Sequence, residues 1–318
     1  MQSLSIEPCN PPLWAHGGHK QTLLGFFLPS EKLKNRGEII KIPLPDGDTL
    51  VGHFYQGSSQ IITVAFHGLT GSAESIYMQM TAIEALKKNH SVLLVNHRGC
   101  GLGKGLAKNP YHSGRGEDIS QVIYYLRQHQ PHKKIFAVGF SLGANALLTL
   151  LTKIRGQHQP DFAMAFNAPV DLSSCSKKLT TGLNRIYDYE FVRLCKQDIK
   201  HRKLLTDQDF KFPLFTRLHH IDQIYTAPVG GFKSAEDYYR KCSTYNSFDQ
   251  IEVPTILVTT KDDPFITWEP YLNAKSNPNI LLHIENHGGH LGYLTQDRSS
   301  LKPARWLSKA ITAGLSII

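Results

Sequence analysis

The chain lacks the features that mark a membrane-spanning, secreted or disulfide-bonded protein. No apolar run approaches 18 residues, so the sequence predicts no membrane-spanning helix. The first residues, MQSLSIEPCNPPLW, contain neither a basic segment nor an apolar core, and we expect no secretory signal. The five cysteines are odd in number and scattered, without a C-x-x-C pair. That usage favours reduced thiols and a cytoplasmic location.

The sequence also contains no nucleic-acid-binding motif, although its formal net charge is +9. Residues 87–134 carry nine Lys/Arg against two Asp/Glu, and residues 171–241 carry 13 against nine. Such a surplus is typical of a solvated basic face, or of a surface that contacts anionic membrane lipids. His16 and His19 have the spacing of a metal-binding pair, but no third ligand stands nearby. We therefore predict no metal and no cofactor.

Apolar, β-prone runs alternate with helical patterns through the first half of the chain, after an irregular segment at residues 1–35. A hairpin is expected around Pro45-Asp46-Gly47-Asp48. The expected strands are 61–66, 92–95, 135–138 and 162–166, and the expected helices are 76–88, 117–130 and 144–151. The pattern resumes with strands at 254–260 and 280–284 and a closing helix at 302–313. This order predicts an α/β fold with a mostly parallel sheet covered by helices on both faces.

The alternation is interrupted once, by the polar and basic residues 171–247. Helices are plausible there at 186–203 and 234–242. An insertion at this point lies over the carboxyl ends of the strands, where open α/β sheets bind ligands. We therefore divide the chain into a core, 1–170 and 248–318, and a helical lid, 171–247. The aromatic side chains of the lid, Tyr187 and Phe191 among them, either line an acyl pocket or form the lid's own core.

Residues 139–143, GFSLG, join an apolar strand to a helix. A G-x-S-x-G sequence in that setting is typical of a nucleophile elbow, in which a strained turn exposes the serine above the sheet. The alternative is a glycine-rich turn in which Ser141 only caps the helix. A serine nucleophile needs a base, and the base needs an acceptor that fixes its tautomer.

Carboxylates and histidines follow the two later strands in the order that this architecture requires. Asp262 and Asp263 end the strand at 254–260, and we favour Asp263 because it stands at the turn before Pro264. His287 and His290 follow the last strand, and we favour His290 because glycines flank its loop. The sequence therefore predicts a triad of Ser141, His290 and Asp263.

Two backbone amides are expected to stabilise a tetrahedral intermediate: those of Leu142, after the nucleophile, and of Leu69, in the loop after the strand at 61–66. His67 in that loop is expected to shape it by hydrogen bonding rather than to act as a second base. The residues expected at the substrate pocket are His67, Phe140, Tyr187 and Phe191.

Several stretches resemble the YheT-like α/β-hydrolases, a family of predicted bacterial esterases, yeast medium-chain ester synthases and mammalian phospholipid-acting relatives. The similar stretches are HGLTGSAESIY from His67, VNHRGCG from Val95, YHSGRGED from Tyr111, GFSLGANAL from Gly139, DYYRKCS from Asp237, VPTILVTTKDDPF from Val253 and HGGHLGY from His287. The segment AHGGHKQTL differs from the family, whose members usually carry Asn-Pro before the histidine, which leaves residues 14–23 without an assigned role.

The resemblance implies an α/β-hydrolase fold and the same triad. It also implies hydrolysis of carboxylic esters with short or medium acyl chains, or of lipid esters, without a cofactor. The alternatives are an acyltransferase that passes the same acyl-enzyme to an alcohol, and a binding protein on a hydrolase scaffold. The expected partner is a small-molecule or lipid ester.

Overall fold

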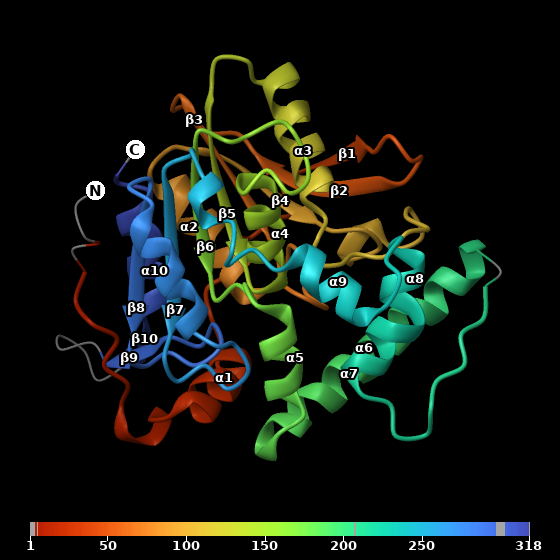
Figure 1. Ribbon diagram of the computed structural model, residues 1–318. Coiled ribbons are helices and arrows are strands. Elements are labelled where there is room, and N and C mark those ends of the chain that lie inside the picture. The colour runs from red at the N-terminus through yellow and green to blue at the C-terminus, as the bar shows by residue number, and fades with distance from the viewer. Residues whose placement is uncertain (1–3, 5, 207, 297–302, 318) are drawn as a thin grey trace.

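The computed structural model describes residues 4, 6–206, 208–296 and 303–317, and an eight-stranded sheet runs through its centre (Figure 1). The strands are β1 (Glu38–Pro43), β2 (Thr49–Tyr55), β3 (Ile61–Phe66), β4 (Ser91–Asn96), β5 (Lys134–Phe140), β6 (Phe162–Phe166), β7 (Thr255–Thr260) and β8 (Ile280–Glu285). Their order is β1-β2-β4-β3-β5-β6-β7-β8. Within this eight-stranded sheet, which lies wholly in the described residues, the β1–β2 and β2–β4 pairs are antiparallel and the others are parallel. The prediction of a mostly parallel sheet is confirmed.

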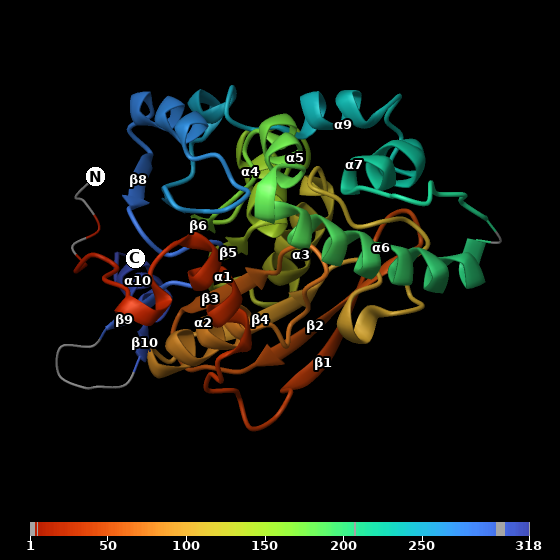
Figure 2. The same ribbon diagram turned by 90° about the horizontal axis from the view of Figure 1, so that it is seen from below.

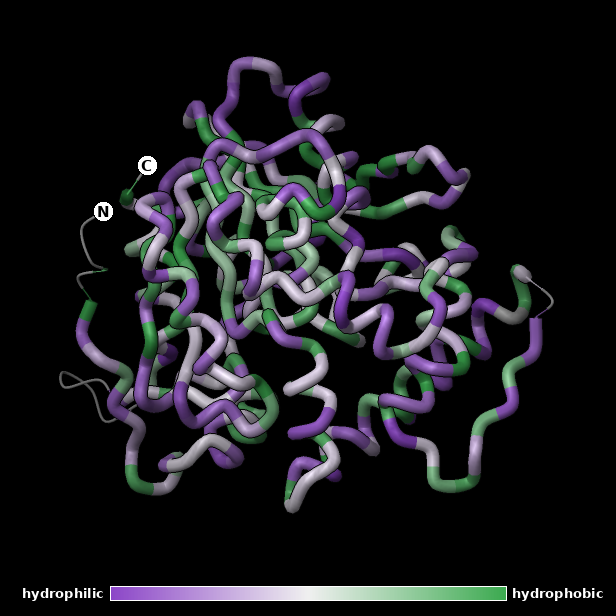
Figure 3. The backbone as a smooth tube through the Cα atoms, viewed as in Figure 1, coloured by the Kyte–Doolittle hydropathy of each residue, from purple (hydrophilic) through white to green (hydrophobic). Residues whose placement is uncertain are grey.

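Helices cover both faces of the sheet. They are α2 (Ile76–Lys87) and α10 (Trp306–Gly314) on one face, and α3 (Gly116–His129) and α4 (Leu142–Leu151) on the other. Strand β4 shows why two layers form: Leu93 and Val95 pack on the α3–α4 side, and Val92 and Leu94 pack on the α2 side. Both sides of the strand are therefore apolar, and hydrophobic residues follow the central strands (Figure 3). Within the described residues, no helix is both long and apolar enough to cross a bilayer.

The expectation of irregular structure over residues 1–35 is wrong for one segment. Residues Gly18–Phe27 form helix α1. The side chain of Gln21 is fully buried, donates to the carbonyls of Ala15 and Leu294, and accepts from the Leu294 amide. Contacts with the far end of the chain thus hold this helix. Strands β9 (Leu294–Gln296) and β10 (Pro303–Arg305) were also not expected, and α10 begins only at Trp306.

The segment between β6 and β7 forms a helical insertion beside the carboxyl ends of the strands (Figures 1 and 2). It contains α5 (Leu172–Leu179), α6 (Arg185–Thr206), α7 (Leu218–Ile221), a π-helical turn (Asp222–Thr226), α8 (Ala227–Val229) and α9 (Ala235–Cys242). Arg202 fastens α6 to the core, because its guanidinium donates to the carbonyls of Arg98, Ala107 and Asn109.

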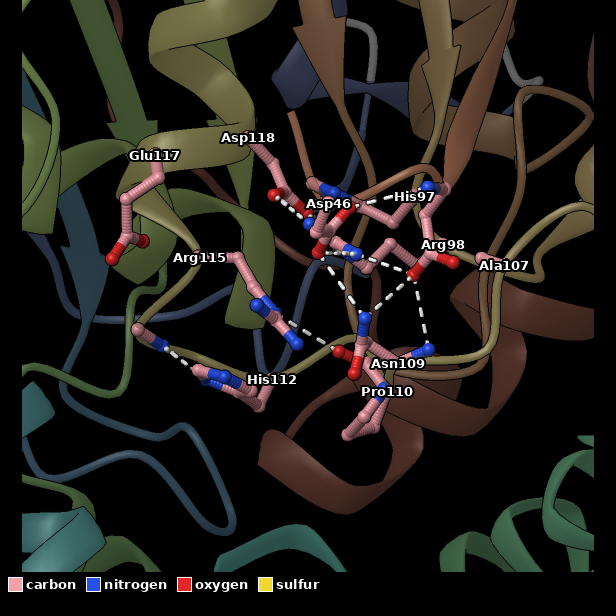
Figure 4. A network of polar contacts seen from close by, with 12 residues as sticks. Asp46, His97, Arg98, Ala107, Asn109, Pro110, His112, Arg115, Glu117 and Asp118 are labelled. Atoms are coloured by element: carbon pink, nitrogen blue, oxygen red, sulfur yellow. Dashed lines mark hydrogen bonds and ion pairs between the residues drawn. The ribbon is translucent and has the colours of Figure 1, made fainter. Parts of the chain in front are cut away.

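Arg98, at the carboxyl end of β4, is the centre of a buried polar network (Figure 4). Its guanidinium pairs with Asp118 on α3 and with Asp46 and Asp48 of the β1–β2 turn. Asp48 and Asp118 are 4% and 2% exposed, so their burial would be costly without this pairing, whereas Asp46 is 39% exposed. Arg98 is only 3% exposed, so it adds nothing to the basic surface predicted for residues 87–134.

Candidate functional site

Ser141 stands between β5 and α4 in a strained backbone conformation. Its φ of 51° and ψ of −121° are unfavourable for a residue with a side chain. The amide of Ser141 donates to the carbonyl of Phe166, which secures the turn at the carboxyl end of β6. Glycine is required at positions 139 and 143 because neighbouring backbone atoms lie too close for a side chain. A Cβ atom would lie 2.6 Å from the Ala144 Cα at Gly139, and 2.3 Å from the His67 carbonyl at Gly143.

The loops after β7 and β8 bring a carboxylate and an imidazole to this serine. His290 Nε2 lies 2.9 Å from Ser141 Oγ, and His290 Nδ1 lies 2.8 Å from Asp263 Oδ2. The imidazole packs against Phe265, with 4.2 Å between ring centroids. Because Nδ1–H donates to the carboxylate, Nε2 presents its lone pair to the serine hydroxyl. Of the alternatives left open by the sequence, the structure brings Asp263 and His290 to Ser141.

Asp263 remains ionised because several donors offset its burial. Burial raises the pKa of this carboxyl, but the charge and hydrogen bond of His290, and the amides of Ile266 and Phe265, hold it below the usual value. Those amides lie 2.9 and 3.0 Å from Oδ1. The carboxylate can therefore stabilise an imidazolium on His290.

Sequence reasoning missed two residues that hold Asp263. Asn167, directly after β6, donates to Asp263 Oδ2 at 2.8 Å and accepts from the hydroxyl of Tyr293 at 2.6 Å. Lys178 on α5 donates to the carbonyls of Asp263 and Ile266, each at 2.9 Å. Asn167 could have been found from the sequence, because it is a polar residue directly after a buried strand. Nothing in the sequence indicated Lys178.

Asp262 and His287 form a separate pair beside the triad. Asp262 Oδ1 accepts from the Gly289 amide at 2.8 Å, and Oδ2 lies 3.6 Å from His287 Nδ1. The imidazole of His287 also packs on that of His16, with 4.7 Å between centroids. This pair therefore supports the loop that carries His290 rather than contacting Ser141.

Helix α1 positions the same loop. Thr22 Oγ1 accepts from the His290 amide at 2.9 Å and donates to the Gly18 carbonyl at 2.7 Å. His19 Nδ1 lies 3.1 Å from the hydroxyl of Tyr187 on α6. Residues 14–23, which have no assigned role in the sequence analysis, thus connect the His290 loop to the helical insertion.

Thr22→Val is expected to lower the kcat of a reaction that uses His290 about fivefold, since it removes one neutral hydrogen bond of about 1 kcal/mol to the backbone of His290. Thr22→Ser keeps the hydroxyl and should retain most of the activity. Steady-state kinetics of both variants test whether the Thr22 hydroxyl positions His290. Equal activity of the valine and serine variants would remove any positioning role for Thr22.

The loop after β3 passes over Ser141. A Cβ atom built on Gly68 would lie 3.0 Å from the Ser141 Cβ. His67 Nε2 accepts from the His97 amide at 3.1 Å, its Nδ1 contacts the Gly68 carbonyl at 2.7 Å, and burial lowers its pKa to about 4. His67 is thus a neutral group that shapes the loop, and its two ring nitrogens bond to the loop backbone rather than to Ser141.

Acidification is expected to destabilise the fold through buried histidines. Burial lowers the pKa of His67 to about 4 and lowers those of His97 and His112 as well. The unfolded chain therefore binds more protons than the native state below about pH 6.5. His67 alone then removes about 3 kcal/mol of stability between pH 6.5 and pH 4.

Carboxyls with a raised pKa oppose this effect, Asp222 among them. Burial raises the pKa of Asp222 to about 6, so the native state binds more protons there and gains stability on acidification. Urea titrations at pH 7, 6, 5 and 4.5 should show a fall in the free energy of unfolding, and a steeper fall in Asp222→Asn. A free energy of unfolding that does not change with pH in Asp222→Asn would contradict the conclusion that the buried histidines are neutral in the native state.

A cavity of about 410 Å³ opens from Ser141 into the helical insertion. Its wall includes Leu69 and Leu142, the two residues whose amides are expected to bind an oxyanion. Apolar side chains from both the core and the insertion make up much of the rest: Leu172, Leu179, Phe191, Leu194, Leu218, Ile221, Phe265 and Ile266.

Of the four residues expected at the pocket, the structure places only Phe191 in the cavity wall. Phe140 belongs to the opposite face of the sheet, because strand alternation puts it on the same side as Phe136 and Val138, where it stacks on Phe166. Tyr187 packs between His19 and Phe265, outside the wall. His67 is fully buried beneath the loop.

Comparison with known proteins agrees with this architecture. A model of the α/β hydrolase fold family matches residues 64–161. The chain is 30% identical over 281 residues to YheT of Escherichia coli (strain K12), which covers 85% of this chain and 82% of that protein. It is 27% identical over 302 residues to phospholipase ABHD3 of Homo sapiens, with 91% and 74% covered. Among solved structures, an esterase of Pyrococcus furiosus, Pf2001, superposes with a TM-score of 0.57 at 17% identity over 91% of each chain, a likeness of fold.

The sheet order, the elbow after β5 and the similarity to YheT over most of both chains agree with one another. The protein belongs to the YheT-like family of α/β-hydrolases, a family of esterase and lipase type.

Proposed function

We propose that this protein is a serine hydrolase that cleaves carboxylic esters through an acyl-enzyme. The observation that carries the proposal is the continuous hydrogen-bond chain from Ser141 through His290 to Asp263 at the base of a cavity. Ser141 Oγ attacks the ester carbonyl carbon while its proton passes to His290 Nε2. The imidazolium then gives that proton to the departing alkoxide, which leaves an acyl group on Ser141.

Water completes the cycle. His290 takes a proton from a water molecule, the hydroxide attacks the acyl carbon, and the proton returns to Ser141 Oγ as the carboxylic acid leaves. In both steps the amides of Leu69 and Leu142 are the proposed donors to the oxyanion. Both residues border the cavity beside Ser141, and the first turn of α4 adds the positive end of its dipole.

The helical insertion, residues 171–247, is the proposed lid, and its apolar wall favours an acyl chain. A cavity of about 410 Å³ suits a short or medium chain. A yeast relative that is 28% identical over 278 residues is named a medium-chain fatty acid ethyl ester synthase/esterase, and ABHD3 is named a phospholipase. Carboxylic esters of this size, including lipid esters, are the substrates that we propose.

Stopped-flow hydrolysis of p-nitrophenyl esters tests the acyl-enzyme. At high enzyme concentration we expect a burst of one p-nitrophenolate per active site, followed by slower turnover. Digestion of the acid-quenched enzyme should place the acyl mass on the peptide that contains Ser141. Turnover with the acyl group on any other side chain would overturn the proposal, as would the absence of turnover for every chain length from acetate to dodecanoate.

A further inference from the structure

The wall of the cavity within the insertion contains a polar group without a partner. Tyr225 lines the cavity and is 5% exposed, and its hydroxyl has no hydrogen-bond partner among the described residues. A buried hydroxyl in that state costs stability, because it has lost water without gaining a replacement. The ring itself is well packed against Phe210, with 4.9 Å between centroids.

The backbone beneath Tyr225 is also unusual. Residues Asp222–Thr226 form a π-helical turn between α7 and α8. Such turns are rare and occur often at functional sites, because they re-aim side chains relative to an α-helix. Here Asp222, Tyr225 and Thr226 all border the cavity.

Asp222 gives the same region an acceptor. The hydroxyl of Tyr239 donates to Asp222 Oδ2 at 2.7 Å and lies 3.1 Å from Ser176 Oγ. Burial raises the pKa of Asp222 to about 6 despite the hydrogen bonds from Tyr239 and Thr226, so it is mostly ionised at neutral pH. Asp222 and Tyr225 are three residues apart in the same π-helical turn, and both border the cavity.

We propose that Tyr225 and Asp222 form a subsite for a hydroxyl group of the substrate, so that the enzyme selects hydroxyl-bearing esters over fully apolar ones. The inference rests on the proposed function and names its substrate class. A ligand hydroxyl accepts from the Tyr225 hydroxyl and donates to the Asp222 carboxylate, whereas a methyl end leaves Tyr225 unpaired. An ammonium group cannot accept from the Tyr225 hydroxyl.

Binding to the Ser141→Ala protein tests the subsite without turnover. The probes are methyl esters of hexanoate, octanoate and decanoate, each with a methyl, hydroxyl or amino group at the far end of the chain. At one chain length the hydroxyl should tighten binding about tenfold over the methyl, as measured by calorimetry. Tyr225→Phe and Asp222→Asn, each in the Ser141→Ala background, should abolish that preference.

The thermal stability of Tyr225→Phe provides a second test, because this substitution should weaken ligand binding but stabilise the fold. Tyr225→Phe should raise Tm by a few degrees, because it removes the unpaired hydroxyl. Tyr271→Phe is the matched control: its hydroxyl donates to the Ala168 carbonyl at 2.7 Å outside the cavity, so its loss should lower Tm. A lower Tm for Tyr225→Phe would contradict the assignment of an unpaired hydroxyl and overturn the proposal.

The remaining outcomes separate the subsite from the proposed function. Equal binding of methyl- and hydroxyl-ended esters at every length overturns the subsite, and so does tighter binding of the amino-ended ester or a preference that survives in Tyr225→Phe. Labelling of the native enzyme by a fluorophosphonate reports on Ser141 alone. If hydroxyl-ended esters bind more tightly but Ser141 is not labelled, the subsite is supported and the hydrolase proposal is contradicted. If Ser141 is labelled but no hydroxyl preference is found, the hydrolase proposal is supported and the subsite is contradicted.

Discussion

Ser141→Ala is expected to lower kcat for p-nitrophenyl esters by on the order of 10⁶-fold, the largest effect of any single change in this chain. The substitution removes the proposed nucleophile, the Ser141 Oγ that would bond to the acyl carbon. His290 and the proposed oxyanion amides would remain, which leaves a slow reaction with water as nucleophile. The rate should be measured for several acyl lengths under saturating conditions.

Loss of activity through misfolding must be separated from loss of the nucleophile. Alanine at position 141 keeps the strained φ of 51° without adding volume, so Tm should change little. The native substrate-binding cavity should also persist, and ester binding should be measurable in the variant. Retention of wild-type turnover would show that Ser141 is not the nucleophile.

Asp263→Asn is expected to lower kcat by about 10⁴-fold, the second largest effect. The carboxylate accepts Nδ1–H from His290 at 2.8 Å and thereby keeps the Nε2 lone pair directed at Ser141. An amide at this position can donate instead of accept, which favours the tautomer with the proton on Nε2. It also cannot stabilise the imidazolium that forms during attack.

Asp262→Asn is the matched control for this change. It alters a neighbouring carboxylate of the same loop, one that accepts from the Gly289 amide and pairs with His287 but does not contact His290. We expect a loss of kcat of less than about tenfold, because only the support of the loop is weakened. Equal losses for the two asparagine variants would contradict the assignment of Asp263 as the partner of His290.

Local pattern was sufficient to predict the sheet and the elbow. The strand before Ser141 is apolar on both sides because helices cover both faces, and a continuous apolar run is readable without any knowledge of its neighbours. The glycines at 139 and 143 are required by contacts within one strand–turn–helix unit, so they too appear as a short motif. Asp263 and His290 could be anticipated because parallel strands bring their carboxyl ends to one edge.

The features that could not be predicted from the sequence depend on contacts between segments that are far apart in the chain. Helix α1 has a weak pattern of its own and is held by the bonds of Gln21 to Leu294, which lies far along the chain. Phe140 adjoins the nucleophile in sequence, yet strand alternation directs it to the opposite face of the sheet. Tyr225 is one of several aromatic residues of the insertion, and the sequence does not single it out, because its unpaired hydroxyl follows from the packing of the insertion.

The most direct test of the account is the site of covalent labelling by a fluorophosphonate. The reagent reacts with a serine that is activated by a neighbouring base, so one adduct is expected per native chain, on the peptide that contains Ser141. Ser141→Ala should take up none, and His290→Ala should react far more slowly. An unlabelled native protein, or an adduct on a different residue, would contradict the claim that Ser141 is an activated nucleophile.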